Sequence, residues 1–252
     1  MERYQDVNAR TVDSWCREGW EWGTPISHEV WLRAKAGQWD VLLTPNKPVP
    51  HAWLGDLYAK RVLGLAAGGG QQMPIFAALG AQCTVLDYSR AQCESERMVA
   101  EREGYQTEIV CADMTQPFPF ADASFDLIFH PVSNCYVAQV DPVFRECYRV
   151  LREGGVLVCG LDNGANYAFD EEKNTLCALP YDPLHDPALY AEAMRAGDGI
   201  QFSHTFEEQI GGQLRAGFVL TDVYEDTNRS GRLRELNIPA FWATRAVKTS
   251  RA

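Results

Sequence analysis

A glycine cluster and two acidic residues of this 252-residue chain each follow a short apolar run. Together they could bind an adenosine-containing ligand. Gly68-Gly69-Gly70 follows the first run, and a backbone without Cβ atoms can approach a ligand closely. Asp87 ends the second run, where a carboxylate can accept hydrogen bonds from both hydroxyls of a ribose. Asp113 ends the third run, where a carboxylate could accept a hydrogen bond from the exocyclic amine of adenine.

A dinucleotide such as NAD would also suit glycines followed by an acid. Dinucleotide sites favour G-x-G-x-x-G, in which the third glycine lets the helix pack closely beneath a pyrophosphate. Counting from Gly68, that third position is Met73. The second acid, Asp113, gives a set of residues that needs no pyrophosphate. An NAD-dependent oxidoreductase is therefore the less favoured interpretation.

The elements that must position these residues alternate regularly from Lys60 onward. Apolar runs predict strands at 61–65, 82–87, 106–113, 125–130, 156–160, 218–224 and 238–247. Caps, stops and periodicity predict helices at 11–17, 27–35, 73–79, 89–103, 141–154 and 205–216. This alternation predicts a mostly parallel sheet with helices on both faces. The last two strands follow each other without a clear intervening helix, so we expect an antiparallel pair at the sheet edge.

We expect a single domain over residues 1–252, with further segments around this core. Residues 1–58 hold six of the seven tryptophans and predict an aromatic-rich cap, which is either an inert cover for one end of the sheet or a lid over a pocket. Within the cap, 44–50 predicts an extended linker. The other predicted segments are a cofactor-binding core at 59–163, an acidic substrate-side insertion at 164–205, and a closing helix with antiparallel strands at 206–252.

Composition and charge argue against several classes of function. The formal net charge is −11 and the pI about 4.9, with no run of five or more Lys or Arg, so we expect no nucleic-acid partner. No stretch of about 18 apolar residues exists and the chain does not begin with the apolar run of a signal peptide, so we expect a cytoplasmic protein without a membrane partner. The eight cysteines form no CxxC pair and the five histidines no HxxxH or HExxH spacing, so we expect no metal site. The sequence leaves the oligomeric state open.

From about Lys60 to Asn163 the chain resembles a class I S-adenosylmethionine-dependent methyltransferase. The matching segments, in the family's order and spacing, are Val62-Leu-Gly-Leu-Ala-Ala-Gly-Gly-Gly70, Val85-Leu-Asp-Tyr88, Cys111-Ala-Asp-Met114, Phe125-Asp-Leu-Ile-Phe129 and Leu151-Arg-Glu-Gly-Gly-Val-Leu157. Trp22–His28 and Phe129–Asn134 also resemble an uncharacterised bacterial subgroup of that family. The resemblance implies an α/β, Rossmann-like sandwich whose seven-stranded sheet is mostly parallel and has an antiparallel edge strand.

The resemblance also implies S-adenosyl-L-methionine as the cofactor and a set of residues that bind it. Gly68 would lie beneath the methionine moiety, Asp87 would bind the ribose, and Asp113 would bind the adenine amine. The full implied set is Leu65, Ala66, Gly68, Asp87, Tyr88, Asp113, Met114 and His130. Family members usually carry an acid where this chain has Gly64, and a glycine where it has Ala66. The methionine ammonium would then need another partner, such as the backbone carbonyl of His130 or a nearby carboxylate.

The remaining candidates concern the methyl acceptor. His130 ends the fourth strand and suits a general base near neutral pH, although a structural histidine fits the position equally well. Other candidates for the substrate pocket are Trp22, His28, Ser133, Asn134, Tyr181 and His204. The sequence favours in-line methyl transfer to a small molecule, because the acidic insertion disfavours a polyanion and a closed cap disfavours a folded partner. The alternative is a non-catalytic protein that binds S-adenosylmethionine or S-adenosylhomocysteine.

Overall fold

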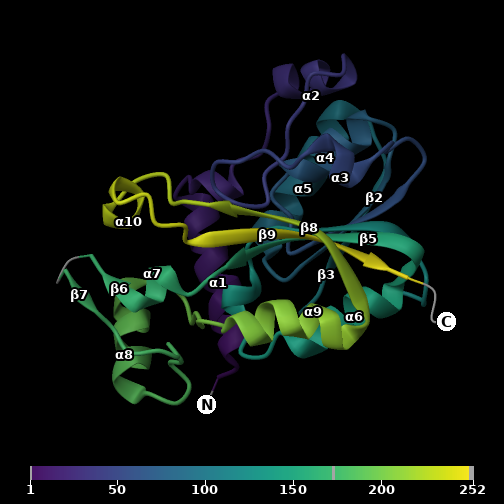
Figure 1. Ribbon diagram of the computed structural model, residues 1–252. Coiled ribbons are helices and arrows are strands. Elements are labelled where there is room, and N and C mark those ends of the chain that lie inside the picture. Colours follow the sequence, from purple (N-terminus) through teal and green to yellow (C-terminus); the bar gives the residue numbers. More distant parts are fainter. Residues whose placement is uncertain (1, 172–173, 250–252) are drawn as a thin grey trace.

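The computed structural model describes residues 2–171 and 174–249, which form an α/β sandwich around one seven-stranded sheet (Figure 1). The strands are β1 (Arg61–Leu65), β2 (Gln82–Asp87), β3 (Thr107–Cys111), β4 (Phe125–His130), β5 (Leu151–Asp162), β8 (Phe218–Asp226) and β9 (Phe241–Lys248). Their spatial order is β3-β2-β1-β4-β5-β9-β8. The first five are parallel, and β9 is antiparallel to both β5 and β8. The predicted fold and the antiparallel pair at the edge are confirmed, with the antiparallel strand lying just inside the edge strand.

Alternating side chains of the central strands pack against different helices, which is why these apolar runs become strands buried on both faces. In β1, Val62 belongs to one apolar cluster and Leu63 to the other. The same alternation separates Leu127 from Ile128 in β4. Helices α2 (His28–Lys35), α3 (His51–Leu54), α4 (Gln72–Ala78) and α5 (Arg90–Glu103) lie on one side of the sheet, and α6 (Asp141–Val150) and α9 (Gly212–Ala216) on the other (Figure 1).

The structure corrects three predicted boundaries. The first helix, α1 (Tyr4–Arg17), begins seven residues before the predicted Thr11, because the buried Asn8 replaces an apolar residue on its inner face and hides the periodicity. The helix predicted over 141–154 ends at Val150, and β5 begins at once with Leu151. Residues 44–50 do not run extended throughout, since Leu42 and Pro48 form an antiparallel bridge around a turn.

The region predicted as an insertion contains secondary structure that the sequence did not indicate. It holds α7 (Ala165–Ala168), the short pair β6 (Phe169–Asp170) and β7 (Thr175–Leu176), and α8 (Pro187–Ala196). The closing helix begins with a π-helical turn, Glu207–Gly211, before α9, and α10 (Arg232–Glu235) separates β8 from β9. The chain returns to the sheet only at β8. The domain boundaries stay a prediction.

Within the described ranges, no helix is long and apolar enough to cross a membrane. In the same ranges, no group of three or more His, Cys, Asp or Glu side chains could hold a metal ion. Five of the eight cysteines are buried, as expected for small apolar residues: Cys83, Cys93, Cys135, Cys147 and Cys159.

Candidate functional site

A cavity of about 490 Å³ lies at the carboxyl end of the parallel strands. Every parallel strand end contributes to its wall, through Ala66–Gly68, Leu86–Ser89, Ala112–Thr115, Pro131–Ser133 and Asp162. Helix α1, the loop Leu42–Pro45 and residues of the segment after β5 complete the wall. Open parallel sheets bind their ligands at this edge. The cavity is therefore the candidate functional site.

Asp87 shapes the glycine loop at one end of the cavity. Its Oδ2 accepts a hydrogen bond from the Gly68 amide at 3.1 Å, and its Oδ1 accepts one from the Ser89 amide at 2.9 Å. A Cβ atom at Gly68 would lie 2.9 Å from Gln92 Cβ, so only glycine lets the loop lie this close to α5. Burial raises the pKa of Asp87 to about 6, against the opposing effect of these amide donors.

Two further features distinguish the backbone and surroundings of this loop. Ala66 has a φ of 47°, a left-handed conformation that its amide holds by donating to the Leu86 carbonyl at 2.8 Å. Gln92, on the cavity wall, carries the one buried side-chain oxygen among the described residues that has no hydrogen-bond partner. A buried acceptor without a donor is costly. This oxygen lies against the loop itself, where a Cβ atom at Gly69 would be only 2.2 Å from it.

The structure brings Tyr88, Asp113 and Met114 to the same end of the cavity as Asp87. The N-terminal segment binds two of them, through Asp6 of α1 and through Arg3, the residue before this helix. The Tyr88 hydroxyl donates to Asp6 at 2.5 Å, and Arg3 forms an ion pair with Asp113. The other Asp113 oxygen accepts a hydrogen bond from the Thr115 amide at 2.8 Å.

Gly64, at the position of the family's usual acid, has no room for a side chain. A Cβ atom there would lie 2.6 Å from the sulfur of Met73 and 2.8 Å from its Cγ. Met73 is fully buried in the cluster between the sheet and α4. Gly64 and Met73, which both depart from a usual pattern, are therefore complementary in volume. Met73 fills the volume that a longer side chain at position 64 would need.

His130 and Leu65 do not line the cavity. The His130 ring is fully buried, with Nδ1 2.9 Å from the Leu65 carbonyl oxygen and Nε2 2.8 Å from Asn134 Oδ1. Burial lowers the pKa of this imidazole, opposed by the two hydrogen bonds. Leu65 packs its side chain into the core below the sheet edge. General-base catalysis by His130 stays a hypothesis that needs a rearrangement of these contacts.

Of the predicted substrate-pocket residues, Trp22 and Ser133 line the cavity and the other four do not. His28 is exposed, 2.7 Å from Glu103 through its Nδ1. Tyr181 stacks at 5.2 Å on Tyr167, which does line the cavity. The remaining two, His204 and Asn134, lie together in a buried network.

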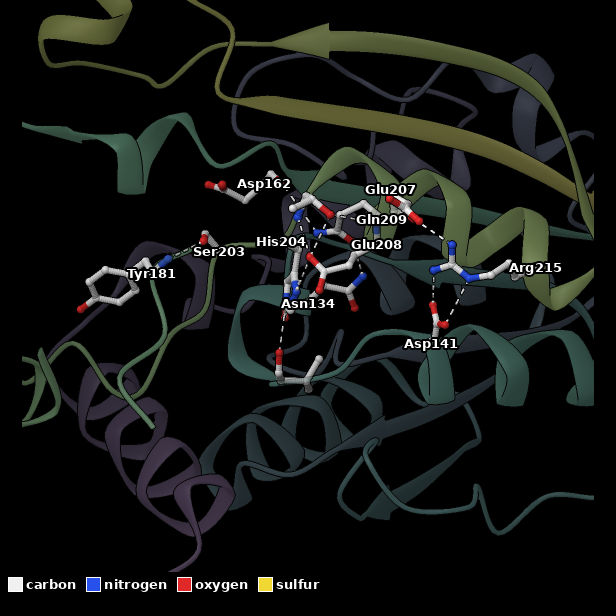
Figure 2. A network of polar contacts seen from close by, with 12 residues as sticks. Asn134, Asp141, Asp162, Tyr181, Ser203, His204, Glu207, Glu208, Gln209 and Arg215 are labelled. Atoms are coloured by element: carbon white, nitrogen blue, oxygen red, sulfur yellow. Dashed lines mark hydrogen bonds and ion pairs between the residues drawn. The ribbon is translucent and has the colours of Figure 1, made fainter. Parts of the chain in front are cut away.

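Figure 2 shows this network, in which His204 lies close to Asn134 and Gln209. His204 Nε2 lies 3.0 Å from the Asn134 carbonyl oxygen and 2.9 Å from that of Val137. The Asn134 side-chain amide donates to Gln209 Oε1 at 3.0 Å. These contacts join the π-helical turn before α9 to the segment after β4. Both residues thus support the cavity wall from behind.

Several wall residues were not anticipated from the sequence. Asp162 was missed because the fifth strand continues two residues beyond the predicted end at Gly160. Gln5 and Asn8 belong to the unpredicted first half of α1, and Tyr167 and Gln201 to the irregular region. A carboxylate directly after an apolar strand was the available signal for Asp162. The others carried no sequence signal, because only the tertiary fold brings them to the site.

The wall has a marked charge bias. It includes the carboxylates Asp87, Asp113 and Asp162, and the described residues that form it include no Lys, Arg or His. Its aromatic side chains are Trp20, Trp22, Tyr88, Tyr136, Tyr167 and Phe241. The cavity therefore suits ligands that are neutral or cationic and have apolar surface.

Comparison with known proteins agrees with this geometry. Residues 63–159 match the family model described as a methyltransferase domain. The chain is 39% identical over 249 residues to the uncharacterized methyltransferase YbaJ of Bacillus subtilis (strain 168), covering 96% of this chain and 97% of that protein.

Solved structures show the same fold. An S-adenosylmethionine-dependent methyltransferase from Mesorhizobium loti superposes with a TM-score of 0.61 at 21% identity, over 78% of this chain and 94% of that one. A second, from Listeria monocytogenes, also has a TM-score of 0.61, at 18% identity, over 79% and 96% of the two chains. With the full-length similarity to YbaJ, these matches assign the family. The chain belongs to the class I S-adenosylmethionine-dependent methyltransferases.

Proposed function

We propose that this chain transfers a methyl group from S-adenosyl-L-methionine, in line, to a small-molecule acceptor bound in the same cavity. The observation that carries the proposal is the division of one cavity into two ends. Gly68, Asp87 and Asp113 lie at one end, and Asp162 lies at the end of β5, three strands away from β2. A volume of about 490 Å³ falls in the range of about 300–1,000 Å³ that small-molecule sites occupy.

The residues present fit the cofactor. Asp87 would bind the ribose hydroxyls and Asp113 the adenine amine, while the glycine loop leaves space for the rest of the molecule. When bound, S-adenosylmethionine supplies an activated methyl group. Trp20 and Trp22 would exclude water, and the cavity walls would hold the acceptor in line. Orientation of this kind contributes about 7–11 kcal/mol to catalysis.

Non-catalytic binding of the cofactor is the second candidate, and one observation favours it. His130 lies outside the cavity lining with both ring nitrogens in hydrogen bonds, so no histidine among the described residues faces the cavity as a base. A base is needed only where the acceptor must lose a proton. Turnover distinguishes the two candidates. An NAD-dependent oxidoreductase is disfavoured by Met73, which fills the space beside Gly64.

Calorimetry with S-adenosylmethionine, S-adenosylhomocysteine and NAD tests the cofactor. We expect saturable binding of the first two and none of NAD. The protein is then incubated with methyl-deuterated S-adenosylmethionine and a deproteinised bacterial extract, and small molecules that gain the labelled methyl are sought by mass spectrometry. Binding without any labelled product in extracts of several sources would favour the non-catalytic candidate. Binding of NAD alone would refute the proposed cofactor.

A further inference from the structure

The part of the cavity around Asp162 has a different character from the cofactor end. Asp162 is the last residue of β5, and three interstrand spacings of about 4.8 Å place it about 14 Å across the sheet from Asp87. Its carboxylate points away from Gln209, although its backbone carbonyl lies 3.5 Å from that side chain (Figure 2). It lines the cavity and is only 7% exposed.

The Asp162 carboxylate has neutral partners only and keeps free acceptor capacity. Oδ1 accepts a hydrogen bond from the Gly164 amide at 2.6 Å, and Oδ2 accepts one from the Asn166 side chain at 2.6 Å. A carboxylate offers about four acceptor positions, so about two remain. No ion pair to Asp162 occurs among the described residues. Burial raises the pKa of Asp162 to about 6, which leaves the group mostly ionised at pH 7.5.

The other two carboxylates of the wall differ in partners or in place. Asp113 has Arg3 as its counter-ion. Asp87, like Asp162, accepts from neutral donors only, but these are the Gly68 and Ser89 amides at the other end of the cavity. A cation beside the aromatic wall is Arg229, whose guanidinium lies 4.5 Å from the Trp22 ring centroid and pairs with Glu21. Arg229 does not line the cavity. Asp162 is therefore the carboxylate at its end of the cavity, and it has no counter-ion among the described residues.

The side chains around Asp162 suit an organic cation. Tyr167 lies five residues along the chain, and its hydroxyl donates to Gln201 Oε1 at 2.8 Å, which leaves the ring as a fixed apolar wall. Phe241 pairs directly with Asp162 in the sheet register, and Tyr136 and Trp22 also face the cavity. Aromatic faces attract cations, and the attraction is stronger where water is excluded. A buried carboxylate repels an anion and stabilises an ammonium group.

We propose that the acceptor of this enzyme carries a cationic amine that pairs with Asp162, while its apolar body packs against Tyr167 and Phe241. This inference rests on the proposed methyl transfer and adds the substrate class to it. It excludes carboxylates and phosphates as acceptors. Asp162 is a binding residue in this proposal, and the methylated atom is a separate question.

Three probes that share one aromatic body test the charge preference: tyramine (cationic), tyrosol (neutral) and 4-hydroxyphenylacetate (anionic). Their affinities are measured by ligand-observed NMR at pH 7.5 with the protein saturated with S-adenosylhomocysteine. We expect tyramine to bind at least 10-fold more tightly than 4-hydroxyphenylacetate. In Asp162→Asn this ratio should fall at least fivefold, with tyrosol unchanged. In Asp162→Glu, which keeps the charge, most of the preference should return.

Asp141→Asn is the matched control, because it removes one negative charge that pairs with Arg215 outside the cavity. Equal affinities in the wild-type protein, no binding of any probe, or a preference unaltered by Asp162→Asn would each overturn the inference. If Asp162→Asn does not fold, the wild-type charge series still decides. Repeating the series without S-adenosylhomocysteine separates the two proposals. If S-adenosylhomocysteine does not bind, the proposed methyl transfer is refuted. The charge preference of the cavity is still measured in that case.

Discussion

A single side chain on the cavity wall can both shape the site and offer a contact to a ligand. Asp87 holds the glycine loop through the Gly68 amide and orders the start of α5 through the Ser89 amide. The same carboxylate can still accept hydrogen bonds from a ribose, since each oxygen uses only one acceptor position. One residue thus shapes the loop and offers a ligand contact. Replacing Asp87 should therefore affect both the conformation of the loop and the binding of the ligand.

We predict that Asp87→Ala weakens binding of S-adenosylmethionine about 10- to 100-fold, because a hydrogen bond to a charged group contributes about 1.5–3 kcal/mol. Calorimetry measures the change in Kd. Asp122→Ala is the control, because this carboxylate is 78% exposed and pairs with Arg149 away from the cavity. An unchanged Kd for Asp87→Ala would show that the ribose lies elsewhere.

His130 leads to a different expectation. Both ring nitrogens bond to groups in the interior, so His130→Asn leaves buried polar atoms without partners, which costs about 1–3 kcal/mol of folding free energy. We predict a lower Tm, with S-adenosylhomocysteine affinity and turnover per folded molecule nearly unchanged. Thermal unfolding, calorimetry and initial rates on the one variant test this. A loss of about 10²- to 10⁴-fold in rate at normal stability would instead identify a general base.

Most of the predicted site residues that line the cavity lie at or shortly after the end of an apolar strand. Gly68, Asp87 and Asp113 were predicted from that position, and all three line the cavity, whereas Trp22 belongs to the cap. Asp162 has the same property but was missed because the fifth strand is longer than its apolar run. Asn8 could not be found, because its side chain binds the backbone of Ile200, which no local pattern connects to it.

Among the elements, β1 and α4 show how a departure from the family pattern is accommodated. Gly64→Ala should destabilise the protein by about 1–3 kcal/mol, because its Cβ would meet Met73 at 2.6 Å. Met73→Ala alone should cost about 2–5 kcal/mol through the cavity it leaves. We predict that the double variant costs at least about 1 kcal/mol less than the sum, measured by urea unfolding. Strictly additive costs would mean that the two residues do not share one volume.

Helix α1 covers the cofactor end and also contacts the region after β5. Asp13 accepts hydrogen bonds from the Ser89 hydroxyl at 2.6 Å and the Ala91 amide at 3.0 Å, while the Trp15 indole donates to the Gly197 carbonyl at 3.1 Å. The helix therefore spans both ends of the cavity. Of the two interpretations of the aromatic cap, this placement favours a lid.

We predict that S-adenosylhomocysteine causes a saturable change in tryptophan fluorescence, because a ligand in the cavity alters the surroundings of Trp20 and Trp22. The change should shrink when these two become phenylalanine. Trp39→Phe is the control, since Trp39 stacks on His51 at 3.8 Å and does not line the cavity. An unaltered spectrum at saturating ligand would favour an inert cap.

The places of the strands in the chain could be predicted from the sequence, and much of the cap could not. Short apolar runs such as Phe125–His130 are buried on both faces of the sheet, and such a run indicates a buried strand of a parallel sheet. The first half of α1 depends instead on the buried Asn8, whose polar side chain is satisfied only by distant backbone groups. Tertiary contacts override the local pattern there.

For the whole molecule, buried acids set the dependence of stability on pH. Glu96 is fully buried behind the glycine loop, where it accepts hydrogen bonds from the Gly70 amide and the Tyr105 hydroxyl, both at 3.0 Å. Burial raises its pKa from 4.5 to about 7. The folded protein then binds a proton that the unfolded chain has lost, so this contribution to stability is present below about pH 4.5 and disappears as pH rises to about 7.

We predict that Glu96→Gln removes this dependence. The shift corresponds to about 3 kcal/mol, so relative to the wild type the variant should gain up to that amount between pH 5 and pH 8. The amide can still accept from Gly70 and donate to the Tyr105 hydroxyl. Urea unfolding at several pH values measures the difference. Parallel stability curves for the two proteins would contradict a raised pKa at Glu96.

The contact between Asn8 and Ile200 joins positions 192 residues apart, and it has a consequence for the order of folding. During synthesis α1 is made before the sheet, and the Ile200 backbone that Asn8 binds is made only after β1 to β5. Contacts of such long range form late and slow the final steps of folding. Asp13 can bind Ser89 and the Ala91 amide as soon as β2 and α5 have formed, whereas Asn8 must wait for the segment after β5. We therefore expect α1 to complete its contacts in two stages, first beside the glycine loop and last at Ile200.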